Sequence, residues 1–223
     1  MGNWLLDSMS ARGGRVAIAG PWGESTYVAL VSAVEDWASI LAFVKPGAVV
    51  AFDAGYTPGS ISLLLALACN RNILVPLGRE AAPHHDTFVE LSQAEYRIAA
   101  VDSEPLMRST GRRADHLLYA ELRRSGRPGL VLFPSERTGS HQHAIHDLSI
   151  LVENHRVTRH AARTLLSRPL DHIAGVNTLV ATLASGGTAV VPSAADAAAE
   201  ATGLVAGSGE VVEHPPAMRE LLR

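Results

Sequence analysis

Short apolar runs that alternate with segments of helical length constrain the fold of this chain more than any other feature of its sequence. Residues 73–77 and 130–133 are apolar runs of strand length, and the second is bounded by Gly129 and Pro134. Residues 60–69 are an apolar segment of helix length. Strands that alternate with helices indicate an α/β fold, so we predict a mostly parallel sheet flanked by helices.

The same order recurs in residues 163–192, RTLLSRPLDHIAGVNTLVATLASGGTAVVP. This segment predicts a strand, a short turn, a helix and a second strand. The expected helix has apolar residues at helical spacing, and Gly186-Gly187 indicates where it stops.

Composition sets outer limits on function. The chain has 223 residues, of which 47% are hydrophobic, so it can bury a core of its own as one domain. A net charge of −3 gives no basic footprint for nucleic acid. No apolar run reaches membrane-spanning length and residues 1–7 do not read as a signal peptide, so we predict no membrane association and a cytoplasmic location.

A polar turn follows the expected strand at 130–133, in the stretch GLVLFPSERTGSHQHAIHD (129–147). Such a turn can aim backbone N–H groups at an anion. The stretch resembles the phosphate-binding loop of adenylate-forming enzymes, which comprise acyl-CoA synthetases, acyl-AMP ligases and nonribosomal adenylation domains. Their pattern is Ser-Gly-Thr-Thr-Gly-x-Pro-Lys, followed in one branch by His-Asp. The chain matches it at Ser135, Thr138, Gly139, His146 and Asp147, and departs from it at Glu136, Arg137, His141, Gln142 and His143.

The departures alter the chemistry that this loop can support. Glu136 stands where the family has a glycine, at the point where the backbone approaches the triphosphate closely. Its carboxylate would repel the negatively charged phosphates. Gln142 replaces the family's lysine, although Arg137 is able to bind a phosphate in its place. We therefore predict that ATP and Mg²⁺ binding is lost and that the chain uses no cofactor. The resemblance still implies that Ser135, Arg137, Thr138, Gly139 and His146 bind a substrate or an anion; a solvated turn without a ligand is the alternative.

Residues 171–175 resemble the family's Asp-His-Ile-Gly-Gly motif, which opens a helix that lines the acyl or aryl pocket. Asp171, His172, Ile173 and Gly175 match, and Ala174 replaces a glycine. In that family the histidine lies beside the substrate carboxylate. The resemblance therefore implies that His172 lines a pocket, with Asp171 and Gly175 as substrate-binding residues. The alternative is that His172 only hydrogen-bonds its own turn at the helix start.

The remaining histidines allow two roles. His141, His143 and His146 are spaced as H-x-H-x-x-H, which is compatible with Zn²⁺ or Ni²⁺ if Glu136 adds a carboxylate, but the sequence shows no second shell and we predict no metal site. Imidazole also suits general acid or base catalysis, because its pKa lies near operating pH. The candidate catalytic residues are His172, His143, His141 and Glu136.

The resemblance extends along nearly the whole chain. Residues 15–19 and 24–29 resemble the family's opening pair of strands, and residues 27–43 resemble its first long helix. Residues 214–223 resemble a helix midway through the family's large domain. The resemblance thus implies one truncated domain over residues 1–223, without the second half of the large domain and without the small mobile domain that carries a catalytic lysine.

Three classes of function follow from these expectations. The first is a ligase remnant that has lost ATP-dependent activation and acts on an acyl or aryl substrate, including one linked to a carrier protein or CoA, in specialised biosynthesis. The second is a non-catalytic partner of a ligase, synthase or carrier protein, and the third is half of a split ligase. The residues at the changed positions of the loop can transfer protons or stabilise charge. This favours the first class of function. We expect a homo-oligomer or a complex with such a biosynthetic protein.

Overall fold

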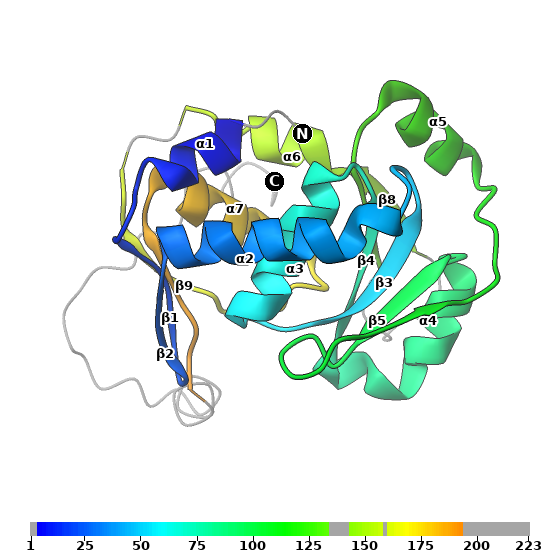
Figure 1. Ribbon diagram of the computed structural model, residues 1–223, viewed down its shortest axis with the longest axis horizontal. Coiled ribbons are helices and arrows are strands. Elements are labelled where there is room, and N and C mark those ends of the chain that lie inside the picture. The colour runs from blue at the N-terminus through cyan, green and yellow to red at the C-terminus, as the bar shows by residue number, and fades with distance from the viewer. Residues whose placement is uncertain (1–3, 134–142, 158–159, 194–223) are drawn as a thin grey trace, which may run out of the picture.

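The computed structural model describes residues 4–133, 143–157 and 160–193, and it confirms the α/β class (Figure 1). The strands form two sheets, one of six strands and one of four, a division that the predicted mostly parallel sheet did not specify. The division arises because the first strand of the chain pairs with the last described one, far away in sequence.

The six-stranded sheet holds the strands predicted at residues 73–77 and 130–133. Its order is β6 (Leu106–Ser109), β5 (Tyr96–Ala99), β3 (Val49–Ala54), β4 (Ile73–Gly78), β7 (Gly129–Leu132) and β8 (Ala144–Asp147). The four central strands are parallel, and the two edge strands run antiparallel to their neighbours. The carboxyl ends of the parallel strands therefore meet at one edge, where ligands bind in open α/β sheets.

The four-stranded sheet joins the two ends of the described chain. Its order is β2 (Gly23–Thr26), β1 (Val16–Gly20), β10 (Thr188–Val190) and β9 (Arg163–Leu165). The predicted opening pair of strands is confirmed as β1 and β2. The second strand is shorter than predicted because the Thr26 side chain accepts a hydrogen bond from the Ala29 N–H and so begins the next helix.

Helices fill the space between the sheets and cover the outer face of the larger one. The inner helices are α1 (Trp4–Ser10), α2 (Tyr27–Ile40) with η1 (Leu41–Phe43), α3 (Pro58–Cys69), α6 (Leu148–Glu153) and α7 (Ile173–Ser185). They share one hydrophobic core with both sheets. The outer helices are η2 (Arg79–His84), α4 (His85–Leu91) and α5 (Leu117–Ser125); α4 and α5 pack in a second, smaller core on the other face of the six-stranded sheet (Figure 1).

Helix α7 confirms the helix and the stop predicted in residues 163–192. Gly186 ends it in the left-handed conformation, with φ of 73°, which glycine adopts without strain. The Arg12 guanidinium donates to the carbonyl oxygens of Ser185 and Ala184 at this end. Across the described residues, the helices are all too short or too polar to cross a membrane.

Candidate functional site

The start of α7 lies against the carboxyl end of β4. The Asp171 carboxylate lies beside Gly78, the last residue of β4, and accepts a hydrogen bond from its backbone N–H. A Cβ at position 78 would overlap this carboxylate. The absence of a side chain at Gly78 is therefore what lets Asp171 reach the strand.

A second close approach fixes the other side of the same turn. A Cβ at Gly175 would overlap the backbone oxygens of Pro169 and Arg168 and the hydroxyl of Tyr56. The Tyr56 hydroxyl itself donates a hydrogen bond to the Arg168 carbonyl oxygen. Tyr56 follows β3 in the chain, so β3 and β4 together hold the turn that opens α7.

The electrostatic environment of this turn is acidic. Burial raises the pKa of Asp171, and the nearby Glu80 carboxylate raises it further, while hydrogen bonds from its own and the Gly78 backbone N–H and the nearby His172 act in the opposite direction. Burial, followed by the charge of Asp171, also raises the pKa of the Tyr56 phenol. Both groups therefore favour their protonated forms more than they would in water.

His172 is the N-cap residue of α7, as the simpler of the two sequence hypotheses stated. Its Nδ1 accepts a hydrogen bond of 3.1 Å from the Ala174 N–H. An acceptor Nδ1 carries no proton, so in the neutral ring the proton lies on Nε2. His172 is exposed and therefore presents an N–H donor to solvent or a ligand. In this tautomer it is suited to hold a carbonyl oxygen, and it has no free lone pair with which to act as a base.

His143 lies on the other face of the six-stranded sheet. Its ring contacts Phe133, at 5.7 Å between centroids, and His116, at 5.9 Å. Phe133 packs in the smaller core with α4 and α5, whereas α7 belongs to the larger core. Burial, followed by the charge of His116, lowers the pKa of His143. The described contacts thus do not bring His143 and His172 together.

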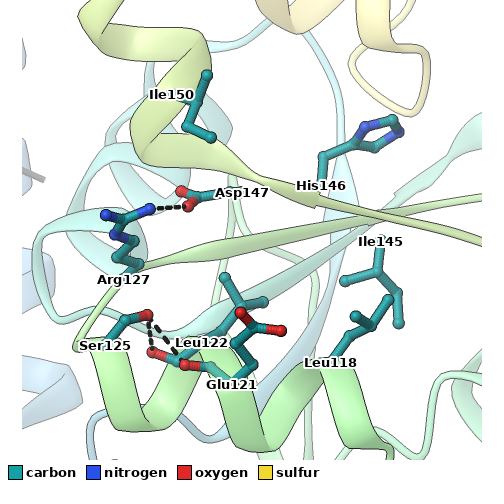
Figure 2. Close-up of a pocket in the computed structure, with 9 residues that line it drawn as sticks. All are labelled: Leu118, Glu121, Leu122, Ser125, Arg127, Ile145, His146, Asp147 and Ile150. Atoms are coloured by element: carbon teal, nitrogen blue, oxygen red, sulfur yellow. Dashed lines mark hydrogen bonds and ion pairs between the residues drawn. The ribbon is translucent and has the colours of Figure 1, made fainter.

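His146 lies at the sheet edge, in β8, and burial lowers its pKa. It lines a pocket of about 420 Å³ between β8 and α5, and Figure 2 shows that Ile145 points toward α5 while His146 points to the opposite side. Asp147 lines the same pocket, where it pairs with Arg127 at 2.9 Å. Asp147 is also in register with Gly129, the first residue of β7. The pocket therefore lies near the amino end of β7, away from the carboxyl ends of the parallel strands.

The other predicted site residues belong to the loop at 135–142. Six of them lie outside the described residues: Ser135, Glu136, Arg137, Thr138, Gly139 and His141. Their predicted roles, and that of His143 alongside them, stay predictions. Within residues 4–133, 143–157 and 160–193, histidine, cysteine and carboxylate side chains nowhere gather in a group of three that could hold a metal ion.

Sequence reasoning missed three groups at the carboxyl edge of the sheet. Asp53 of β3, Arg97 of β5 and His85 of α4 converge there, with Asp53 paired to Arg97 and 3.8 Å from His85 Nδ1. Asp53 also accepts from the Ala100 N–H at 3.1 Å, and the His85 ring nitrogen Nε2 lies 2.9 Å from the Gly78 carbonyl oxygen. This network ties β3, β4, β5 and α4 together. No local pattern in the sequence indicates it, because its members are distant in the chain.

Tyr56 and Gly78 were missed in the same way. Each follows or ends a parallel strand, and that position is the one signal that could have identified them.

Several solved structures share this fold. The N-terminal subdomain of Klebsiella oxytoca NpsA superposes with a TM-score of 0.67 at 16% identity, over 88% of this chain and 56% of that one. The N-terminal domain of FACL13 from Mycobacterium tuberculosis superposes with a TM-score of 0.65 at 19% identity, over 85% of this chain and 56% of that one. The o-succinylbenzoate CoA synthetase MenE from Bacillus subtilis superposes with a TM-score of 0.62 at 18% identity, over 90% of this chain and 46% of that one.

The chain thus spans about half the length of the solved structures that it matches. No protein-family model matches the sequence, and no curated protein matches it either. At these identities the likeness is one of fold, and it agrees with the order of strands and helices predicted from the sequence. The chain has the fold of the N-terminal subdomain of adenylate-forming enzymes.

Proposed function

We propose that this chain binds an acyl or aryl group at the start of α7 and acts on it without ATP, as part of a specialised biosynthetic pathway. The observation that carries the proposal is the position of His172. Its Nδ1 is held by the Ala174 N–H, so its Nε2–H is a fixed donor at the carboxyl edge of a parallel sheet. A fixed donor of this kind binds a carbonyl oxygen with little reorganisation.

The ligands of proteins with this fold support the choice of an acyl or aryl group. NpsA subdomains have been solved with 3-hydroxyanthranilyl-AMSN and with 3-hydroxybenzoyl-AMSN. MenE has been solved with its acyl-adenylate intermediate OSB-AMP. Each of these ligands contains an acyl group that carries an aromatic ring, and we carry over only that part to this chain.

The sequence of the loop at 135–142 supports the loss of ATP. Glu136 adds a negative charge where a triphosphate would lie, and Gln142 lacks the positive charge of the family's lysine. Bound nucleotide would therefore meet repulsion, and Arg137 would have to supply the positive charge of the missing lysine.

A non-catalytic role is the second candidate. It is favoured by the separation of His143 and His172, whose described contacts lie on opposite faces of the six-stranded sheet. In that role the site would bind the acyl group of a carrier protein or a ligase product without changing it.

Binding of an aromatic acyl probe tests the proposal. Methyl anthranilate is fluorescent, and we expect its emission to change in a saturable way when the protein is added. His172→Ser introduces a hydroxyl that can still cap the helix through the Ala174 N–H, but it removes the imidazole Nε2–H donor. It should therefore weaken binding by up to about tenfold, the upper end of the effect of one lost hydrogen bond. His116→Ser is the matched control, because His116 caps α5 through Nδ1 in the same manner, at 3.2 Å from the Leu118 nitrogen. If no aromatic acyl probe binds, or if both variants bind equally well, the proposal is wrong.

A further inference from the structure

We infer that β8, the edge strand of the six-stranded sheet beside α5, pairs with β8 of a second copy of this chain, so that two sheets join edge to edge across a two-fold axis. The acyl site proposed at the start of α7 plays no part in this contact. The unpaired backbone of β8, the apolar side chains around it and the order of its residues point to the second copy as its partner.

β8 differs from the other edge strands of the two sheets. An edge strand presents unpaired backbone groups to any other strand, and proteins commonly protect such edges with charged side chains. The other edge strands each carry an exposed charged residue: Arg108 in β6, Glu24 in β2 and Arg163 in β9. β8 carries none, since all four of its residues are half-buried and its one carboxylate, Asp147, is paired with Arg127. β8 is therefore the least protected edge in the described part of the chain.

The backbone groups of Ile145 point away from the sheet. Just beyond the strand pair, the Leu148 N–H donates to the Pro128 carbonyl oxygen at 3.0 Å. Hydrogen-bonded pairs alternate along an antiparallel ladder, so the next one is formed by Leu130 and His146, which are in register. The N–H and C=O of Ile145 then face outward, where they have no partner among the described residues.

Apolar side chains flank this edge. The pocket of about 420 Å³ opens beside β8, and Figure 2 shows Ile145 and Leu118 of α5 facing each other across it. Leu117 and Leu118 are exposed by 84% and 46%, and Ile150 of α6, at the same pocket, is exposed by 54%. In a two-fold contact each of these side chains approaches its counterpart in the second copy. The contact would therefore bury apolar surface together with the backbone groups.

The side chains of β8 favour one register of self-pairing. When the two-fold axis passes beside Ile145, the two copies of this residue exchange their N–H and C=O groups in two hydrogen bonds. The same register sets Asp147 opposite His143 of the partner subunit, a carboxylate opposite an imidazole that can donate to it. A register centred on His146 would instead set Ile145 opposite a carboxylate. The register centred on Ile145 thus pairs apolar with apolar and acceptor with donor.

Sedimentation of the full chain tests the contact. We expect a dimer, and Ile145→Pro should weaken it by about tenfold or more, because proline removes one outward N–H from each copy and two hydrogen bonds are lost. The bonds between β7 and β8 are kept, since the Ile145 N–H does not face β7. Arg163→Pro, on the edge strand β9, is the matched control. The Thr188 N–H donates to the Ala162 carbonyl oxygen, so Ala162 faces β10 and the next residue, Arg163, faces outward. This variant should leave the dimer unchanged.

A cross-link tests the register without proline. Cys69→Ala removes the one cysteine of the chain. In that background Ile145→Cys places two thiols beside the axis, where the Cα atoms of a hydrogen-bonded pair lie about 5.5 Å apart, within the range of a disulfide. We expect a covalent dimer under mild oxidation, and none for Arg163→Cys in the same background.

Several results would overturn the inference. They are a monomer at every concentration, including one whose edge instead takes a strand of another protein, and a dimer that Ile145→Pro leaves intact or that Arg163→Pro weakens equally. Failure of Ile145→Cys to cross-link would overturn it as well. If circular dichroism shows that Ile145→Pro does not fold, the cross-link and its control decide. The proposed acyl binding is measured separately, so it stands or falls by its own probe.

Discussion

The carboxylate of Asp171 occupies the place that a Cβ of Gly78 would need, and the two residues are 93 positions apart in the chain. This relationship joins the first turn of α7 to the carboxyl end of β4. It also fixes where His172 points, because His172 follows Asp171 directly and its Nδ1 is held by the Ala174 N–H.

Replacement of Gly78 by alanine tests this contact. The new Cβ would displace the Asp171 carboxylate, so Gly78→Ala should lower the free energy of unfolding by about 1–3 kcal/mol, the usual range for an overpacked site. It should also weaken binding of methyl anthranilate. Gly55→Ala is the matched control, because a Cβ at Gly55, just after β3, would meet no atom within 4 Å. Chemical denaturation followed by circular dichroism measures both, and equal stabilities of the two variants would contradict the contact.

The pH dependence of stability should report on Asp171. Its pKa is raised above 3.8 on folding, so the folded state holds its proton more tightly, and stability falls as pH rises from below 3.8 through the folded pKa. Asp171→Asn removes this loss. At pH 7 we expect the variant to be more stable by about 0.5–1 kcal/mol, a modest value because solvent screens a partly exposed group. The difference should disappear below about pH 4. A variant that is less stable than the wild type at pH 7 would show that the charge itself is needed.

His143 should make the fold sensitive to acid. Burial and the charge of His116 lower its pKa below 6.5, so its contribution to stability is present above pH 6.5 and is lost as pH falls through the folded pKa. We expect His143→Gln to reduce the fall in Tm between pH 7 and pH 5 by about 1–3 °C. His160→Gln, at an exposed histidine, should leave that fall unchanged. Thermal melts at several pH values check this, and a steeper fall for His143→Gln would refute it.

Nucleotide binding should be absent from the wild-type chain. Because Glu136 repels a triphosphate and Gln142 supplies no counter-charge, calorimetry with ATP and Mg²⁺ should show no saturable heat at millimolar nucleotide. The double variant Glu136→Gly with Gln142→Lys restores the family pattern at both positions. A micromolar Kd for the wild type would overturn the prediction of a degenerate loop.

Self-association stays a prediction from the sequence. The structure suggests which exposed apolar surface would form the contact. Leu118 of α5 and Ile150 of α6 line the pocket beside β8 and are exposed by 46% and 54%. Exposed apolar surface of this kind favours a protein contact. We expect a homodimer in sedimentation experiments and a weaker one for Ile150→Lys, with Val28→Lys on α2 as the exposed apolar control. A monomer over a wide concentration range would count against it, unless the source cell supplies a cognate partner.

Much of the local structure follows from short-range patterns in the amino-acid sequence. The helical spacing of apolar residues and the glycine pair at 186–187 located α7 and its end, and the short apolar runs located β4 and β7, because these signals depend on neighbouring residues. The resemblance at residues 171–175 also identified the turn that forms the candidate site.

The tertiary structure alone decided which residues meet. The pairing of β1 with β10 divides the strands into two sheets, and it joins segments about 170 residues apart that no local pattern connects. Tyr56, Gly78 and Asp171 come together because the ends of β3 and β4 are neighbours in a parallel sheet. The separation of His143 from His172 was likewise decided by which face of the sheet each side chain occupies. Alternation along a strand separates its two faces, but only packing determines which helix covers each face.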